Sequence, residues 1–553
     1  MAQSAALTRR SAPVFLAILA IAVLPLVALG LLGGSGSGTG GPTPGLVGVV
    51  SPSPGSSAPG SSEGGSSELP SPGSPGASPP ASPLPAADVS IVPVVDFRST
   101  VTGIDAADVA RVAAGTHPDW NRLELVRADA TGILAALGVD RSAIGSRLVI
   151  ASSITILDRD LAAHSDRLAF VRAAQVTPAV RALAWEGRSL FGVDRETKAS
   201  RWHLTAHLAG DQRPFDPAKT WTIVAGGDIM LDRGVAKAVK VEGKGVDFPF
   251  NGGTAEITGH HCCSALDWPI PLTKRTGNAG VVRHLISGAD IAVANFENPA
   301  PNQFSYHTQG TTFSADPRLI KGLADAGIDV VSVANNHIGD AGRTGVTQTL
   351  ANLQKYGLEH AGAGKNAAAA HRPAILTVEG LKVAILGYDT IAGYYTAGTS
   401  TAGSARLTLP SVRADVAAAR RAGADLVIVY PHWGTEYRAS PFPAQQRLAR
   451  GIIDAGADMV IGNHAHWVGA MEVYKGKPIW YALGNFVFDQ TWSEPTMEGL
   501  ILELTFRGKD LVQVRLHPTI ILDGAQPNFL DPAGDGRVVL GQLYDASKKL
   551  LPW

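Results

Sequence analysis

Cysteine is almost absent from this sequence. Its only two cysteines, Cys262 and Cys263, are adjacent. One adjacent pair can build neither a disulfide framework nor a zinc site made of cysteines. The run from His260 to Cys263 is typical of an irregular, glycine-containing loop. We therefore expect unpaired cysteines there, in preference to a vicinal disulfide or a metal site.

An excess of charge of either sign is also missing. The chain has 47 Lys and Arg against 48 Asp and Glu, a formal net charge of -1. This balance argues against a protein that coats nucleic acid, so we expect no nucleic-acid partner. At 553 residues the chain is too long for one small domain. Its 62 glycines and 36 prolines exceed average usage and indicate a low-complexity stretch.

Charged residues are absent from the apolar run at 12–33, which follows Arg9 and Arg10. A run of this length can span the bilayer core as a helix, and the preceding arginines favour a cytoplasmic N-terminus. The alternative is a cleaved signal peptide, whose apolar region is usually about 7 to 15 residues long. We therefore predict a transmembrane signal anchor at 1–33 and a single-pass protein of the cell membrane with an extracytoplasmic head.

Residues 34–87 consist mainly of Gly, Ser and Pro. Such a composition cannot bury enough apolar area to fold. We predict a disordered linker that lets the folded head stand off from the membrane.

The segment 88–216 has a mixed pattern that predicts a small α/β domain. Residues 90–97 are rich in β-branched side chains, and a helix is expected between Asp105 as N-cap and Gly115 as its end. The stretches 92–100 and 175–192 resemble one lobe of a periplasmic solute-binding protein. That resemblance implies a recognition lobe, and the alternative is a spacer or docking domain.

From residue 220 onward, short apolar runs alternate with helical patterns, which is typical of α/β organisation. We expect helices at 412–423 and 443–457. Buried strands are expected at 222–227, 291–295, 330–335, 383–388, 426–431, 459–463 and 478–485.

Polar residues of the types that bind metals cluster just after these expected strands. In open α/β sheets, sites form at this edge. Two carboxylates, an amide and three imidazoles converging there suit a first-row divalent metal such as Mn, Fe or Zn. His464 and His466 would place both rings on one side if the segment is extended. The five stations are Gly227-Asp228, Asn295-x-Glu297, Asn335-Asn336-His337, His432-Trp433-Gly434 and His464-x-His466.

Six motifs carry a resemblance to a known family. They are GGDIMLDR, ANFENP, ANNHIGDAG, YPHWGTEY, GNHAHWV and YALGNFVFD, in this order between residues 226 and 489. Together they resemble the CapA family of capsule-synthesis proteins, associated with poly-γ-glutamate, within the calcineurin-like metallophosphoesterase superfamily. The resemblance covers about residue 222 to the C-terminus. It implies that 220–553 is a four-layer αββα sandwich.

The resemblance also implies roles for individual residues. His337 matches the histidine that contacts the substrate or protonates the leaving group, Asp340 would orient it, and Arg233 would bind an anionic group or pair with a carboxylate. Met230 stands where superfamily enzymes usually have a histidine ligand, which puts one of two metal positions in doubt. The implied ligands of one or two divalent ions are Asp228, Glu297, Asn336, His432, His464 and His466.

Two functions follow from these motifs and their resemblance. The first is a membrane-tethered, extracytoplasmic metal-dependent hydrolase that acts on a cell-surface polymer or phosphoester during capsule polymer biosynthesis. The alternative is a non-catalytic, polymer-binding accessory subunit of a membrane polymer synthase, with a structural metal site. A nearly complete ligand set favours the first, and the missing histidine favours the second.

The predicted anchor and linker can be tested by fractionation. We expect the full-length protein to fractionate with membranes, and added protease to release a head that begins after about residue 87. Edman sequencing or mass spectrometry would identify the new N-terminus. A soluble secreted protein that begins near residue 30 would show a cleaved signal peptide instead.

Overall fold

The computed structural model describes residues 85–211, 213–550 and 552. The anchor predicted at 1–33 and almost all of the linker predicted at 34–87 lie outside these residues. Among the described residues, no helix has the length and apolar character needed to cross a bilayer.

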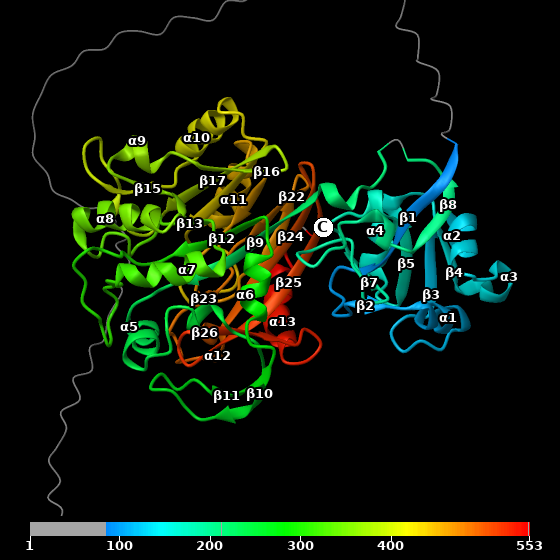
Figure 1. Ribbon diagram of the computed structural model, residues 1–553, viewed down its shortest axis with the longest axis horizontal. Helices are drawn as coiled ribbons and strands as arrows, with labels where there is room; N and C mark the ends of the chain where they lie inside the picture. The colour runs from blue at the N-terminus through cyan, green and yellow to red at the C-terminus, as the bar shows by residue number, and fades with distance from the viewer. Residues whose placement is uncertain (1–84, 212, 551, 553) are drawn as a thin grey trace, which may run out of the picture. The chain divides into compact units, whose positions relative to one another are not determined.

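The segment 85–216 contains a mixed six-stranded sheet with helices, as expected from its sequence (Figure 1). Helix α1 begins after Asp105, whose side chain accepts a hydrogen bond from the backbone N–H of Asp108, and ends at Gly115 with φ 74°. The predicted boundaries of this helix are thus confirmed. The sheet contains β4 (Leu148–Ala151), β3 (Arg122–Val126), β5 (Arg167–Arg172), β1 (Ala86–Asp96), β6 (Val180–Ala182) and β8 (Thr205–Ala209). The remaining elements are β2 (Gly103–Ile104), β7 (Ala184–Trp185), α1 (Ala106–Ala114), α2 (Ala130–Ala136), α3 (Arg141–Ile144) and α4 (Ile154–Ala163).

One of the two large sheets formed after residue 220 has ten strands, which come from both the beginning and the end of this segment. Its strands β9, β12, β13 and β14 run parallel, and β24 and β25 extend it as a long antiparallel hairpin. In spatial order they are β11 (Ile270–Gly277), β10 (Thr254–His261), β26 (Gln526–Leu530), β25 (Asp510–Leu522), β24 (Glu498–Arg507), β9 (Thr220–Ile229), β12 (Ile291–Phe296), β13 (Val330–Ser332) and β14 (Glu359–Ala361), with β23 (Asn485–Val487) also paired to β9.

The other large sheet has six strands, which all come from the middle of this segment. Strands β17, β19, β20 and β22 are parallel, and the sheet is closed by antiparallel neighbours at both edges. Its spatial order is β16 (Ala374–Val378), β17 (Leu381–Asp389), β19 (Leu426–His432), β20 (Met459–Ile461), β22 (Lys477–Trp480) and β21 (Met471–Tyr474). A short separate pair is formed by β15 (Ala363–Gly364) and β18 (Gly403–Ser404).

Helices connect these strands, and the two long ones expected from sequence are α10 and α11. Pro443 occupies the first turn of α11, where its missing N–H costs nothing. The helices of this segment are α5 (Arg233–Ala236), α6 (Val281–Ser287), α7 (Ile320–Ala326), α8 (Gly342–Lys355), α9 (Ala367–Ala370), α10 (Leu409–Arg421), α11 (Pro443–Asp454), α12 (Glu494–Met497) and α13 (Gly536–Ser547).

The two large sheets share one apolar core. Ile223 of β9 and Ile428 of β19 belong to the same buried cluster. Val224, the next residue of β9, belongs instead to a cluster that includes side chains of α6, α7 and α8, because successive side chains of a strand point to opposite faces. Val427 of β19 packs in the same way with α10 and α11. The predicted α/β class is confirmed, and every strand expected after residue 220 overlaps an observed one.

Side-chain hydrogen bonds also join the two sheets, and one of them comes from Tyr430. The hydroxyl of Tyr430, in β19, donates to the backbone oxygen of Gly226 in β9. Both residues are buried, and burial raises the pKa of Tyr430 far above that of a free phenol. The contact fixes the C-terminal end of β19 against that of β9.

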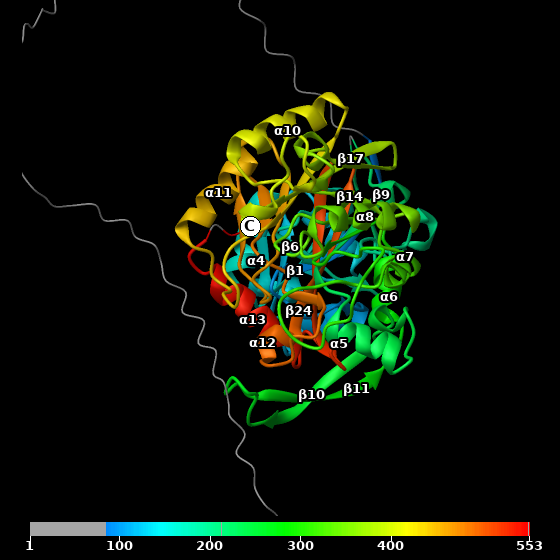
Figure 2. The ribbon, with the colours of Figure 1, turned by 90° about the vertical axis from the view of Figure 1, so that its left-hand side faces the viewer.

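The expected loop contains Cys262 and Cys263, but the prediction proved wrong for the two preceding histidines and for the state of the cysteines. His260 and His261 end strand β10, which forms a hairpin with β11, and this hairpin lies at the lower edge of both views (Figures 1 and 2). Cys262 and Cys263 are joined to each other by a disulfide. No local sequence feature distinguished a vicinal bond from two free thiols.

Hydrogen bonds connect segment 85–216 to the ten-stranded sheet. The fully buried amide of Gln513, in β25, accepts from the backbone N–H of Ala182 at 2.5 Å and donates to the oxygen of Val180 at 2.9 Å. Glu503 of β24 accepts from the backbone N–H of Val193 at 2.6 Å. Segment 85–216 nevertheless has its own apolar cluster, to which the rest of the chain contributes only Val512 among the buried members.

A truncation tests whether segment 220–553 is an autonomous metal-binding unit. We expect a fragment from Thr220 to Trp553 to retain the metal stoichiometry of the longer protein, because all candidate ligands lie within it. Its melting temperature should be lower, since Gln513 and Glu503 lose buried hydrogen bonds. Elemental analysis and thermal unfolding would check both points, and non-cooperative unfolding would contradict autonomy.

Candidate metal centre

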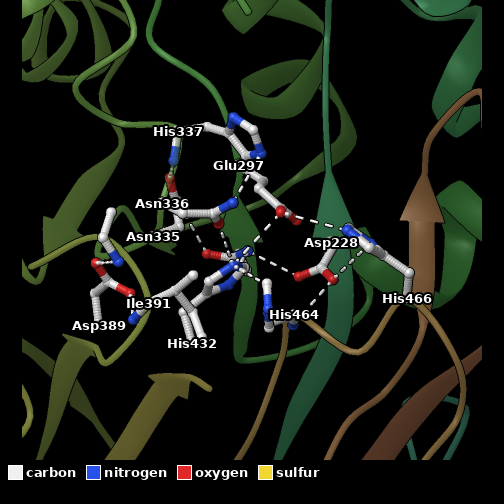
Figure 3. Close-up of polar contacts among 12 residues, drawn as sticks. Asp228, Glu297, Asn335, Asn336, His337, Asp389, Ile391, His432, His464 and His466 are labelled. Carbon is white, nitrogen blue, oxygen red and sulfur yellow. Dashed lines mark hydrogen bonds and ion pairs between the residues drawn. The ribbon is translucent and has the colours of Figure 1, made fainter. Parts of the chain in front are cut away.

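The predicted site residues lie at the C-terminal ends of strands from both large sheets (Figure 3). Parallel strands present these ends at one edge, and the two sheets bring their edges together there. The structure places Asp228 near the end of β9, Glu297 directly after β12, Asn336 and His337 after β13, His432 at the end of β19, and His464 and His466 after β20.

Two fully buried carboxylates, Asp228 and Glu297, form the centre of this group. Asp228 accepts hydrogen bonds from the Asn295 side-chain amide at 2.8 Å and from the His464 backbone N–H at 3.2 Å. Neither oxygen of Glu297 has a hydrogen-bond partner among the described residues. Burial, followed by the negative charge of Asp228, raises the pKa of Glu297 well above its usual value. A bound cation would offset both effects.

Imidazole nitrogens surround Glu297. His432 Nε2 lies 3.4 Å from Glu297 Oε1, 2.8 Å from Asn336 Oδ1 and 3.0 Å from His464 Nδ1. Burial, and then the neighbouring imidazoles, lower the pKa values of His432 and His464 well below the usual range. Both rings are therefore neutral at pH 7, the form of histidine that binds metals.

His466 lies on the other side of Glu297. Its Nδ1 is 3.4 Å from Asp228 Oδ2, and its Nε2 is 3.7 Å from Glu297 Oε1. Asn485 Oδ1 lies 2.9 Å from the same Nδ1 and holds the ring in place. Asn485 in turn donates to Gln490 Oε1 at 3.0 Å, so its orientation is set by the chain that follows β23.

Two overlapping groups of donor atoms can each hold a divalent ion. The first group is Glu297, His432 and His464, and the second is Asp228, Glu297 and His466. Within each group the donor atoms lie within 4.8 Å of one another. Because Glu297 belongs to both groups, it would be a ligand of an ion held by either one.

Met230 does not contribute to either group. It is fully buried in the apolar cluster that includes side chains of α6, α7 and α8. Its sulfur accepts a hydrogen bond from the Asp232 backbone N–H at 3.0 Å. Each donor group keeps three donors without a histidine at this position. One or two ions therefore remain compatible with the geometry.

The premise of an extended segment at His464 and His466 proved wrong. These residues lie in a bend and have φ values of 93° and 54°. Non-glycine residues seldom adopt positive φ, and such strain concentrates at functional sites. The two rings still face the same centre because the bend, rather than strand periodicity, turns them there (Figure 3).

His337 lies at the more exposed side of the site. Its Nδ1 is 2.8 Å from Asp340 Oδ2, and its Nε2 is 3.0 Å from the Asn336 side-chain nitrogen. Asp340 is itself fixed, since it accepts from the Phe313 backbone N–H at 2.9 Å. The expected contact between His337 and Asp340 is thus present, and the catalytic role of the pair stays a prediction.

Arg233 is engaged by other protein groups. Its guanidinium pairs with Asp489 and donates to the backbone oxygen of Gly310 at 2.7 Å. It also lies 4.8 Å from the centre of the Phe313 ring. The structure thus shows the salt bridge that the sequence left open as the alternative, and contact of Arg233 with an anionic substrate group stays a prediction.

Two asparagines have roles that their sequence context did not assign. Asn295 lies between Asp228 and His432, with its amide nitrogen 3.2 Å from His432 Nδ1. Asn485 holds the His466 ring through its side-chain oxygen. One indication of these roles is present in the sequence, because Asn295 and Asn485 each lie within a motif of the family resemblance.

Comparison with known proteins identifies the family. The family model described as "Bacterial capsule synthesis protein PGA_cap" matches residues 222–490. The "Capsule biosynthesis protein CapA" of Bacillus anthracis is 30% identical over 291 residues, which are 51% of this chain and 71% of that protein. The chain belongs to this capsule synthesis family. A "Probable polyglutamine synthesis accessory protein" of Mycobacterium tuberculosis is 31% identical over 333 residues, 56% of this chain and 82% of that family member.

The family match covers every predicted ligand, since Asp228 and His466 both lie inside it. Among solved structures, a 5'-nucleotidase precursor from Thermus thermophilus aligns with 14% identity and a TM-score of 0.33. That alignment covers 60% of this chain and 58% of the nucleotidase.

Substitution of Glu297 tests whether the buried carboxylates need a cation. We expect Glu297→Gln to raise the melting temperature of chelator-treated protein, because it removes one of two adjacent buried carboxylates. The same variant should lose the stabilisation that added Mn²⁺ gives the wild-type protein. Thermal unfolding with and without Mn²⁺ would measure both.

Glu379→Gln is the matched control, because Glu379 is exposed in the turn between β16 and β17. It should leave both melting temperatures unchanged. A Glu297→Gln protein that Mn²⁺ stabilises as strongly as it does the wild type would exclude Glu297 as a ligand.

Proposed function

We propose that this protein is a membrane-tethered, extracytoplasmic metal-dependent hydrolase that acts on a cell-surface polymer or phosphoester during capsule polymer synthesis. The observation that carries the proposal is the sharing of Glu297 by two donor groups, with the His337–Asp340 pair beside them. We further propose that the two sheets and their flanking helices form the four-layer αββα sandwich of metallophosphoesterases.

The chain's own residues can perform the proton transfers of such a reaction. A divalent ion held by these residues, of the Mn, Fe or Zn type, would act as a Lewis acid and make water a better nucleophile at neutral pH. His337 would donate a proton from Nε2 to the leaving oxygen or nitrogen, after this atom is released from the Asn336 side-chain nitrogen that lies 3.0 Å away in this structure. Asp340, 2.8 Å from Nδ1, would stabilise the imidazolium and fix the ring.

Site burial supports a reaction that excludes bulk water. His432, His464 and the two carboxylates are almost completely buried, whereas Asn336 and His337 are partly exposed. A substrate would therefore approach from the side of His337. Electrostatic interactions are stronger in such a desolvated site than in water.

A non-catalytic role as a polymer-binding subunit of a membrane synthase is the second candidate. The Mycobacterium tuberculosis relative is named as a probable synthesis accessory protein, which favours this role. So does Met230, because a three-donor second group holds an ion less firmly than a four-donor group. In this case the metal would only stabilise the junction between the sheets.

A pair of histidine variants separates the two candidates. We expect His337→Ala to keep its metal and to lose turnover by about 10²- to 10⁴-fold, the usual loss when a positioned acid is removed. His464→Ala should lose metal first. Turnover of bis(p-nitrophenyl) phosphate and of poly-γ-glutamate, together with elemental analysis, would measure both properties.

His284→Ala is the matched control, since His284 lies on α6 and is largely exposed. It should change neither property. Equal metal loss in the His337 and His464 variants would make His337 a ligand. A metal-loaded wild-type protein that turns over neither substrate but binds the polymer would favour the accessory role.

A further inference from the structure

A cavity lies outside the metal centre, beside the junction of β6 and β25. Its volume is about 860 Å³, within the usual range for a ligand site. None of the candidate metal ligands lines it. The cavity is lined by residues from segment 85–216 and from the ten-stranded sheet. They include Arg181 of β6, Ser189 after β7, Thr254 of β10, and Arg515 and His517 of β25.

The walls of this cavity are fixed relative to each other. The buried Gln513 amide, in β25, bonds to the backbone on both sides of Arg181, at Val180 and Ala182. Arg515 follows Gln513 by two residues, so its side chain leaves the same face of β25. The guanidinium of Arg515 donates to the Ser189 hydroxyl at 2.8 Å. Two arginines are thereby held at one cavity.

Arg181 is the unusual group. It is only partly exposed, and its guanidinium has no hydrogen bond or ion pair to any residue that the structure describes. Burial, and then the positive charge of Arg515, lower the pKa of Arg181 to about 10. Elsewhere in the same domain the chain pairs a buried arginine fully, since Arg172 binds both Asp129 and Asp211.

The carboxylates that line the cavity are engaged elsewhere. Glu256 pairs with Lys274 at 3.1 Å. Asp535 accepts from the Ile257 backbone N–H at 2.6 Å, and Asp531 accepts from the Ala533 N–H at 2.9 Å. None of them forms an ion pair with Arg181.

The acid nearest to Arg515 is also occupied. Glu503 Oε2 lies 2.8 Å from His517 Nε2 but 3.8 Å from the Arg515 guanidinium, and its other oxygen accepts from the Val193 backbone. Arg515 thus keeps donors available. The cavity lining as a whole is not positive, because it also contains three carboxylates. Arg181 is its one charged side chain for which the described residues supply neither a hydrogen bond nor an ion pair.

We propose that this cavity binds a carboxylate-bearing chain, with Arg181 and Arg515 each taking one carboxylate. The fork of an arginine matches a carboxylate with two parallel hydrogen bonds, and a partly desolvated arginine gains most from such a partner. The identity of the chain rests on the proposed function, which supplies an acidic capsule polymer. The cavity then holds the polymer away from the metal centre and is a separate polymer-binding site.

Binding by an Arg181 variant of the full-length protein tests this site. We expect Arg181→Gln to weaken the binding of a fluorescent poly-γ-glutamate chain by about tenfold or more, the scale for removing one partner of a desolvated charge pair. Arg413→Gln, an exposed arginine on α10, removes the same charge outside the cavity and should bind as the wild type does. Fluorescence anisotropy would measure both.

Turnover separates this proposal from the proposed hydrolase activity. Arg181→Gln should hydrolyse bis(p-nitrophenyl) phosphate at the wild-type rate, because Arg181 lies outside the metal centre. If neither the wild type nor the variants turn over substrate, but Arg181→Gln still weakens polymer binding, the hydrolase proposal is overturned and the proposed polymer-binding site is supported. Wild-type polymer affinity in a folded Arg181→Gln protein would overturn the cavity proposal.

Chemical protection of the wild-type protein gives an answer even if the variant fails to fold. Poly-γ-glutamate should protect Arg181 from phenylglyoxal, as mapped by mass spectrometry, whereas inorganic phosphate at equal charge concentration should protect it weakly. Equal or stronger protection by phosphate would assign the cavity to a phosphate ligand and overturn the carboxylate proposal. Absence of protection by either would overturn the site.

Discussion

The structure depends on the burial of two adjacent carboxylates, Asp228 and Glu297, at the meeting point of two sheets. An isolated buried carboxylate costs several kcal/mol, and a second one beside it adds repulsion. The protein provides Asp228 with two N–H donors but leaves both oxygens of Glu297 without a hydrogen-bond partner among the described residues. A chain that keeps such an arrangement in its core is built around a cation.

The surrounding structure holds the donors of this cation in place. Asn295 connects Asp228 to His432, and Asn485 orients His466. Tyr430 joins the sheet that carries His432 to the sheet that carries Asp228. These contacts restrict the donors before any ion arrives, which reduces the entropy lost on binding.

Sequence patterns predicted the parts of the fold that depend on local signals. Continuous apolar runs predicted the buried parallel strands, and Asp105 with Gly115 predicted the ends of α1. The positions of the ligands followed from the rule that sites form at strand ends. The β24–β25 hairpin was not predicted, because its pairing depends on contacts with β9.

Other features had no local signal at all. Positive φ at His464 and His466 results from the path of the chain between two sheets, and these residues favour no such conformation by themselves. The isolation of Arg181 becomes visible only when β25, more than three hundred residues later, is placed beside it. Local sequence patterns extend over at most a few tens of residues, so they carry no information about pairing between segments this far apart.

The donor set draws on nearly the whole length of the family-matched region, from Asp228 near its beginning to His466 near its end. A chain emerging N-terminus first has only the two carboxylates of this set until β19 and β20 have also formed and joined. An ion that uses the whole donor set could therefore bind only after residues from both large sheets have come together.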